Sequence, residues 1–240
     1  MSSNKQFTLY GEVWAPNPMK VAMVLDELGL EYDIVPVDLI ANEHKGPEYT
    51  KINPNGRIPA LVDHSNGDFT IWESNAILLY IAERYDKEHK LTVEDSNEKY
   101  KLIQWLFFQA SGQGPYYGQA FWFIRYHPER VPSAIERYQK EILRVFSVLD
   151  SVLAKQEWLV GNKLTIADLS FISWNAGALA FALRGLEGVN VEEQYPSFYK
   201  WHQKLSARPV VASLLGRQVK YVLEAQAEVE AAATAAAAAK

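Results

Sequence analysis

Two short segments in the first third of the chain have residue types that could bind a peptide. In the first, a proline begins a strand-like run, Ile58 to Val62. A proline inside a strand lacks the N–H that would pair with the neighbouring strand. If the Ile58–Pro59 bond is cis, the backbone N–H and carbonyl of Ile58 face outward and can pair with an extended peptide. The alternative, a trans proline that opens an edge strand, remains open from the sequence alone.

The second segment is Glu73-Ser74, where a helix is expected to begin. Free backbone N–H groups at a helix start, together with a serine hydroxyl, form an anion site. Because the carboxylate of Glu73 suits an ammonium group, the pair is able to recognise both charges of an α-amino acid. The simpler alternative is that Ser74 only caps its helix.

The elements around these segments alternate between strand and helix over residues 1–88. Apolar spacing predicts a helix on the face of Val21 and Leu28 that ends at Gly29, and Pro47 can open a short one. A turn at Asn66-Gly67 tolerates positive φ and joins the last two strands. The order βαβαββα predicts a mixed four-stranded sheet of the thioredoxin-like α/β type; its strands and last helix are expected at 7–10, 32–39, 58–62, 69–72 and 74–85.

From about residue 97 onward the pattern is helical only, so residues 96–226 are predicted to form a second, all-helical domain after a polar linker at 86–96. Helices are expected at 97–124, 133–155, 165–183, 196–206 and 209–223. Residues 227–240 form an alanine-rich tail that either extends the last helix or is disordered. Thr165 as N-cap and Asp168 three residues later form a capping box, which gives Asp168 a structural role.

Composition excludes several classes of function. The 24 basic and 29 acidic side chains give a net charge of −5 without a basic stripe, which disfavours nucleic acid as a partner. No segment is apolar enough to span a membrane, and the polar start of the chain does not resemble a secretory signal, so we expect a soluble, cytoplasmic protein. The five histidines lack metal-binding spacing, and no metal is expected. The chain has no cysteine, so thiol chemistry requires a borrowed thiol.

Taken together, these motifs resemble the cytosolic glutathione transferases from about residue 7 to residue 217. More narrowly, the chain resembles their fungal nitrogen-regulator-like (prion regulator-like) branch, which is related to the bacterial Nu class. The motifs that carry this resemblance are Ala15-Pro16-Asn17, Lys20-Val21-Ala22, Glu43-His44, Asn53-Pro54-Asn55, Arg57-Ile58-Pro59-Ala60-Leu61, Ile71-Trp72-Glu73-Ser74, Trp105-Leu106-Phe107-Phe108-Gln109, Trp158-Leu159-Val160-Gly161 and Leu164-Thr165-Ile166-Ala167-Asp168-Leu169.

The resemblance implies a glutathione site in the first domain. The backbone of Ile58, before cis Pro59, would pair with the cysteinyl unit of glutathione. Glu73 and Ser74 would hold the γ-glutamyl end. A histidine and an arginine near the glycyl carboxylate correspond to His44 and Arg57.

The family's thiol activator in this branch corresponds to Asn17. A free thiol is only about 3% thiolate at pH 7, so donors are needed. Asn17 offers an amide NH2, and Pro18 after it suits the first position of a helix, whose N-terminus would also face the sulfur. The competing interpretation is that Asn17 is an N-cap, and both roles are compatible. Relatives carry a hydroxyl residue where this chain has Trp14, which departs from the pattern and adds a ring near the sulfur.

The second-substrate pocket is expected in the helical domain, where residues 104–126 are rich in aromatic side chains. Tyr and Trp suit a partly open apolar pocket. We predict Phe108, Tyr116 and Trp122 as wall residues, with Trp14 beside them. The expected reaction is conjugation of glutathione to hydrophobic or aromatic electrophiles, such as isothiocyanates and halonitroarenes, as in xenobiotic detoxification.

Two alternatives stay open. One is reduction of disulfides or peroxides, which in a chain without cysteine requires two glutathiones. The other is a carrier or regulator without turnover, since a fold does not guarantee its function. The resemblance also implies a homodimer.

Overall fold

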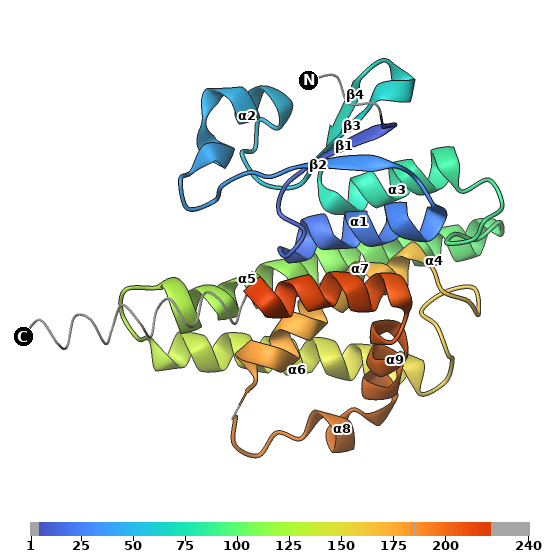
Figure 1. Cartoon of the computed structure of the whole chain (residues 1–240). Helices are drawn as coiled ribbons and strands as arrows, with labels where there is room; N and C mark the ends of the chain where they lie inside the picture. The colour runs from blue at the N-terminus through green and yellow to red at the C-terminus, as the bar shows by residue number, and fades with distance from the viewer. Residues whose placement is uncertain (1–4, 185, 222–240) are drawn as a thin grey trace, which may run out of the picture.

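The computed structural model describes residues 5–184 and 186–221, and its first part is a mixed four-stranded sheet in the order β2-β1-β3-β4 (Figure 1). β2 runs parallel to β1, while β3 is antiparallel to both β1 and β4. The predicted order βαβαββα is confirmed. The strands are β1 (Phe7–Tyr10), β2 (Tyr32–Val35), β3 (Ala60–Asp63) and β4 (Phe69–Trp72).

Two strands are shorter than expected because prolines limit them. β2 ends at Val35, directly before Pro36, and β3 begins at Ala60, directly after Pro59. Neither proline has an N–H to donate to a neighbouring strand.

Helices flank the sheet on both faces. α1 (Pro16–Leu28) and α3 (Ser74–Tyr85) lie between the sheet and the helical part, and α2 (Pro47–Ile52) lies on the other side (Figure 1). α1 ends as predicted at Gly29, which has φ 68. One-turn 3₁₀ helices, η1 (Glu43–Lys45) and η2 (His64–Asn66), complete this part.

The described residues after 96 form helices without a strand. They are α4 (Ser96–Phe108), α5 (Gly114–Phe121), α6 (Pro132–Leu153), α7 (Ile166–Gly177), α8 (Val191–Gln194), α9 (Pro196–Ser206) and a last helix over 209–221. The alanine-rich tail lies outside the described residues, and α8 was not expected.

Two of the long expected helices, 97–124 and 165–183, are interrupted by π-helical turns. These turns are η3 (Gln109–Gln113), η4 (Trp122–Tyr126) and η5 (Ala178–Ala182). A π turn takes more residues than an α turn and so rotates the faces of the helix that follows; such turns are frequent at functional sites.

α7 is the central helix of the second part, and Asp168 fixes its start. The predicted capping box with Thr165 is confirmed. The buried Asp168 carboxylate also accepts hydrogen bonds from Leu159 N and Trp201 Nε1, both at 3.0 Å. Burial raises the pKa of Asp168 to about 6, while the bonds from Leu159, Thr165 and Trp201 oppose that rise.

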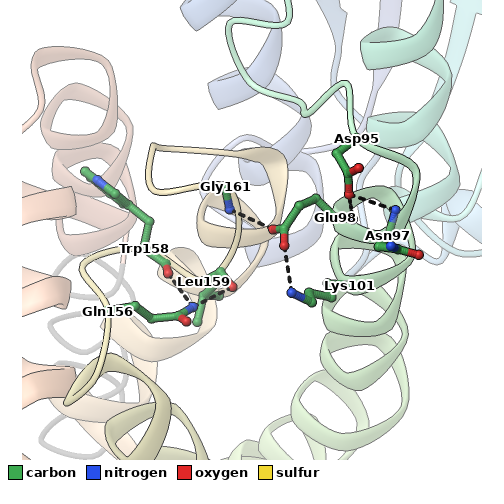
Figure 2. A network of polar contacts seen from close by, with 8 residues as sticks. All are labelled: Asp95, Asn97, Glu98, Lys101, Gln156, Trp158, Leu159 and Gly161. Carbon is green, nitrogen blue, oxygen red and sulfur yellow. Dashed lines mark hydrogen bonds and ion pairs between the residues drawn. The ribbon is translucent and has the colours of Figure 1, made fainter.

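Figure 2 shows how the loop before α7 is tied to the start of α4. Glu98 accepts a hydrogen bond from Gly161 N at 3.2 Å, and Gln156 donates to two carbonyls within the loop. Gly161 has φ 69, and a Cβ there would lie 2.5 Å from Cγ1 of Val93, so only glycine fits. The predicted linker is itself packed, because buried Asp86 accepts the backbone N–H groups of residues 90 and 91 at 2.6 and 2.8 Å.

Two negative findings apply to the described part of the chain, residues 5–184 and 186–221. None of its helices combines the length and hydropathy that a bilayer crossing needs. It also contains no cluster of three or more potential metal-ligand side chains.

Candidate active site

Strand register brings three chain segments to one edge of the sheet. Ala60 in β3 pairs with Tyr10 at the end of β1 and with Trp72 at the end of β4. The next residues outward, Gly11, Pro59 and Glu73, therefore lie at the same edge. This edge carries both the proline segment and the Glu-Ser segment singled out from the sequence.

Gly11 allows the start of α1 to approach the proline segment. It has φ 141, and a Cβ there would lie 2.9 Å from Cγ of Pro18 and 3.3 Å from Cβ of Ile58. The Ile58–Pro59 bond is cis, which decides between the two interpretations of this proline. Within the described residues, no hydrogen bond engages the backbone N–H or carbonyl of Ile58. Both groups are thus available to an extended peptide.

α3 begins at Ser74, and Glu73 occupies its N-cap position. The interpretation of Ser74 as the cap is therefore wrong. Glu73 has φ 69 and ψ 107 and accepts no capping hydrogen bond. A non-glycine residue at positive φ is strained, and such strain concentrates at ligand sites.

A second acid-serine pair, Asp95-Ser96 at the start of α4, offers a comparison within the chain. Asp95 has φ −60, and its carboxylate accepts the N–H groups of Asn97 and Glu98, both at 3.0 Å (Figure 2). It satisfies its own helix start. Glu73 does not, so the first N–H groups of α3 are left for a ligand.

His44 and Arg57 lie on neighbouring turns. Gly56 packs so closely on η1 that a Cβ there would lie 2.7 Å from the carbonyl oxygen of His44. Nδ1 of His44 is buried and has no hydrogen-bond partner within the described residues. Burial and the charges of Lys45 and Arg57 lower the pKa of His44. The group of basic side chains suits a carboxylate.

Asn17 is the second residue of α1, whose cap position is Ala15, so the capping interpretation of Asn17 is wrong. Its Oδ1 accepts a hydrogen bond from Nε1 of Trp174 in α7 at 3.0 Å. An indole N–H only donates, which fixes the amide orientation and leaves the NH2 group of Asn17 to donate elsewhere. Ser173 holds the same turn through a 2.9 Å hydrogen bond to the carbonyl of Pro16.

A buried polar network connects this edge to the second part. Lys20, only 1% exposed, donates from Nζ to Oε1 of Gln109 at 2.6 Å. Asn75, beside Ser74, donates to the same oxygen at 2.9 Å, and Gln109 donates to Gln113 at 3.0 Å. Burial lowers the pKa of Lys20 to about 7, although the Glu73 carboxylate opposes that shift. Sequence reasoning did not assign this network. One feature of the sequence could have indicated the network: Lys20 lies four residues before Val24, on the apolar face of α1.

A cavity of about 440 Å³ opens beside the start of α1. Such a volume accommodates a small organic molecule. Trp14 lines it and stacks on Tyr221, with ring centroids 3.6 Å apart. The described lining residues are Trp14, Pro16, Phe121, Arg125, Tyr126, Trp174, Ala176, Gly177, Ala180, Phe181, Arg184, Leu215, Gln218, Val219 and Tyr221.

Of the four predicted pocket residues, only Trp14 lines this cavity. Phe108 packs on Phe171, with centroids 6.1 Å apart. The ring centroid of Tyr116 lies 6.3 Å from that of Tyr138, and 47% of the surface of Trp122 is exposed. Phe108, Tyr116 and Trp122 thus lie outside the described lining of this cavity, and their contact with a second substrate stays a prediction. The sequence predicted one continuous helix over 97–124, whereas the π turns η3 and η4 change which faces point inward for the residues from 109 onward, Tyr116 and Trp122 included. The cavity uses Phe121, one residue from Trp122 and thus on another face of its helix.

The comparisons with known proteins agree with this arrangement. The model of the glutathione S-transferase N-terminal domain matches residues 5–83, and that of the C-terminal domain matches residues 115–209. The chain therefore belongs to the glutathione transferase family, and its fold is the thioredoxin-like fold with a helical second part that this family shares.

Within the family, the relatives are fungal glutathione transferases and Ure2-like proteins, which confirms the narrower resemblance. Glutathione S-transferase 1 of Schizosaccharomyces pombe is 50% identical over 212 residues, covering 85% of this chain and 93% of the relative. The transcriptional regulator URE2 of Saccharomyces cerevisiae is 36% identical over 244 residues, covering 87% of this chain and 67% of the relative.

Solved structures support the same family assignment. The glutathione transferase URE2P5 from Phanerochaete chrysosporium matches with a TM-score of 0.89 and 53% identity, covering 94% of this chain and all of that chain. URE2P6 from the same fungus, solved with oxidized glutathione, matches with a TM-score of 0.86 and 57% identity, covering 92% and 99%. The chain is accordingly a glutathione transferase enzyme.

Proposed function

We propose that this transferase conjugates glutathione to hydrophobic or aromatic electrophiles, isothiocyanates and halonitroarenes among them. The observation that carries the proposal is the Asn17–Trp174 hydrogen bond. It orients a side-chain donor at the junction between the peptide-binding edge of the sheet and the cavity. A sulfur held at that junction faces the second substrate.

Each part of glutathione has a binding group in this proposal. The free backbone groups of Ile58 pair with the cysteinyl unit, as in β-strand addition. The unsatisfied N–H groups at the start of α3, with the Ser74 hydroxyl, bind the γ-glutamyl carboxylate, and Glu73 binds its ammonium. His44 and Arg57 bind the glycyl carboxylate.

Thiolate stabilisation then depends mainly on Asn17. Of the first three residues of α1, Pro16 and Pro18 have no N–H, so Asn17 provides both the backbone and the side-chain donor. The helix dipole adds a smaller electrostatic contribution. Each unit by which the thiol pKa falls corresponds to about 1.4 kcal/mol of preferential thiolate stabilisation.

The bond changes differ between the two electrophile classes. With a halonitroarene, the sulfur forms a bond to the ring carbon and the halide leaves with its bonding pair. With an isothiocyanate, the sulfur adds to the central carbon and the nitrogen takes a proton. In both, the proton of the glutathione thiol is released before attack.

Reduction is the second candidate function. The ligand of one solved relative favours conjugation, and the ligands of two others favour reduction. Ure2p5 was cocrystallized with 1-(S-glutathionyl)-2,4-dinitrobenzene, a conjugation product, whereas URE2P6 and URE2P8 hold oxidized glutathione. Reduction would have the bound thiolate attack a disulfide sulfur, with a second glutathione resolving the mixed disulfide.

We also propose a homodimer, supported by exposed rings on β4 and α4. Phe69 of β4 and Tyr100 and Phe107 of α4 are 44%, 71% and 69% exposed. Burial of such rings against a second copy would be favourable. Sedimentation at the monomer mass over micromolar concentrations would contradict this assembly.

The cytoplasmic location of the protein stays a prediction.

The test compares three reactions side by side. Turnover of an isothiocyanate, a hydroperoxide and a mixed glutathione disulfide is measured for wild type, Asn17→Ala and the exposed-site control Asn97→Ala. We expect the isothiocyanate to react fastest. Asn17→Ala should lower that rate about 10- to 100-fold through loss of one hydrogen bond to a charged group, and the control should leave it unchanged.

The outcomes separate the candidates. Dominant turnover of the disulfide favours the reductase. Calorimetric binding of glutathione without turnover of any substrate favours a carrier. Rates that survive Asn17→Ala show that Asn17 is not the activator.

A further inference from the structure

Two arginines, one within a π turn and one just beyond another, line the cavity proposed for the second substrate. Arg125 lies within η4, and Arg184 follows the end of η5 by two residues. Both line the same cavity of about 440 Å³. These segments are far apart in the sequence, so this pair exists only in the folded chain.

The arginines lack a carboxylate partner among the described residues. The other described lining residues are aromatic, aliphatic or neutral, without an Asp or Glu. Neither arginine belongs to an ion pair of the described residues. Arg208, by contrast, is matched by Glu27 through bonds of 2.9 and 2.8 Å. Among the described residues, the cavity therefore holds two positive charges without an internal counter-charge.

The setting of Arg125 suits recognition of a planar anion. Its guanidinium carbon lies 5.6 Å from the centre of the Tyr126 ring, and the side chain is half-buried. A guanidinium presents a rigid fork of donors that matches a carboxylate in two parallel bonds. In a cavity with an apolar wall, such a pair is less screened by water than at an open surface.

We propose that the preferred second substrate is an aromatic electrophile with a carboxylate, which Arg125 and Arg184 bind while Trp14 and Phe121 contact its ring. This inference deepens the proposed conjugation and rests on it. A second glutathione also carries carboxylates, so the test includes a glutathione disulfide as a further substrate.

The test uses a matched pair of substrates, 4-chloro-3,5-dinitrobenzoate and the neutral 4-chloro-3,5-dinitrobenzamide. In both reactions the glutathione sulfur bonds to the ring carbon, the carbon–chlorine bond breaks, and chloride leaves with the electron pair. The thiol proton goes to the buffer. Each kcat/KM is divided by the rate constant of the uncatalysed reaction, which removes differences in intrinsic reactivity.

We expect the corrected benzoate-to-benzamide ratio of the wild type to be about 10 or more, the range of a charge-assisted hydrogen bond. Arg125→Gln should lower the ratio about 10-fold, and Arg184→Gln about 3-fold because that side chain is exposed. Arg130→Gln is the matched control. It removes an arginine five residues beyond Arg125 that does not line the cavity, and the ratio should not change.

Three outcomes would overturn the proposal in distinguishable ways. If neither chloroarene is turned over, the proposed conjugation of halonitroarenes fails as well. If the benzamide is turned over and the arginine variants leave the ratio unchanged, only the carboxylate preference fails. If the variants slow a glutathione disulfide but not the benzoate, the recognised carboxylate belongs to a second glutathione. Because exposed Arg184 is tolerant of change, Arg184→Gln keeps the test valid should Arg125→Gln not fold.

Discussion

The corner formed by Ile58-Pro59 and Glu73-Ser74, where we propose that glutathione binds, and the cavity proposed for the second substrate are built in opposite ways. The corner comes from two short contiguous motifs placed side by side by strand register. The cavity is assembled from segments spread between residues 14 and 221. A site made of local motifs is readable from sequence, whereas a site made by convergence depends on the phase of every helix that reaches it.

The two regions also differ in the chemical groups that they offer to a ligand. The corner offers mainly backbone groups, freed by the cis bond at Pro59 and by the uncapped start of α3. The cavity offers side chains, and two of its walls stand on π turns. We therefore expect the corner to fix one ligand and the cavity to set which electrophile is accepted.

Ser74→Ala should produce the largest effect and keep it confined to the corner. Loss of one hydrogen bond to a carboxylate should weaken glutathione binding about 10- to 100-fold. The KM for the electrophile, measured at saturating glutathione, should change less than about twofold if the two regions act separately. Isothermal titration and steady-state kinetics give the two numbers.

Ser96→Ala provides the matched control, because Ser96 also follows an acid and begins a helix. Asp95 already satisfies the start of α4, so this variant should bind glutathione like wild type. An equal loss of affinity in both variants would mean that the serine hydroxyl matters only for helix stability.

The next prediction concerns Lys20, in the buried polar network that joins the two regions. The pKa of Lys20 is lowered by burial to about 7 from 10.5. Between these values the folded chain has released the proton that the unfolded chain keeps, so stability rises with pH. The unfolding free energy of wild type minus that of Lys20→Met should rise by up to about 1.4 kcal/mol per pH unit within this window, and be flat below pH 7.

Denaturant unfolding at pH 8 and pH 9 measures this difference. Lys99→Met, a change of an exposed lysine on α4, is the control and should give no slope. A flat difference for Lys20→Met would show that the ammonium keeps its proton in the folded chain, with Gln109 and Glu73 together offsetting its burial.

Sequence predicted the elements of the first part and the capping box at Asp168 because each depends on neighbours in the chain. It did not predict the π turns, since no residue type marks where a helix takes up an extra residue. Nor did it assign Lys20 and Gln109, whose partners come from the other part of the molecule. The same limit explains why three aromatic residues were predicted at the cavity but lie elsewhere.

The smallest effect separates two tryptophans that the sequence made look alike. Trp14 lines the cavity and stacks on Tyr221, so Trp14→Ala should change the KM for an aromatic electrophile about 2- to 10-fold, the worth of one aromatic pair. Trp122 is 47% exposed and outside the lining, so Trp122→Ala should change that KM less than about twofold. Equal effects would mean that η4 moves when substrate binds and that the cavity is wider than these residues define. The paired measurement therefore tests whether helix phase, rather than aromatic content, decides which rings contact the second substrate.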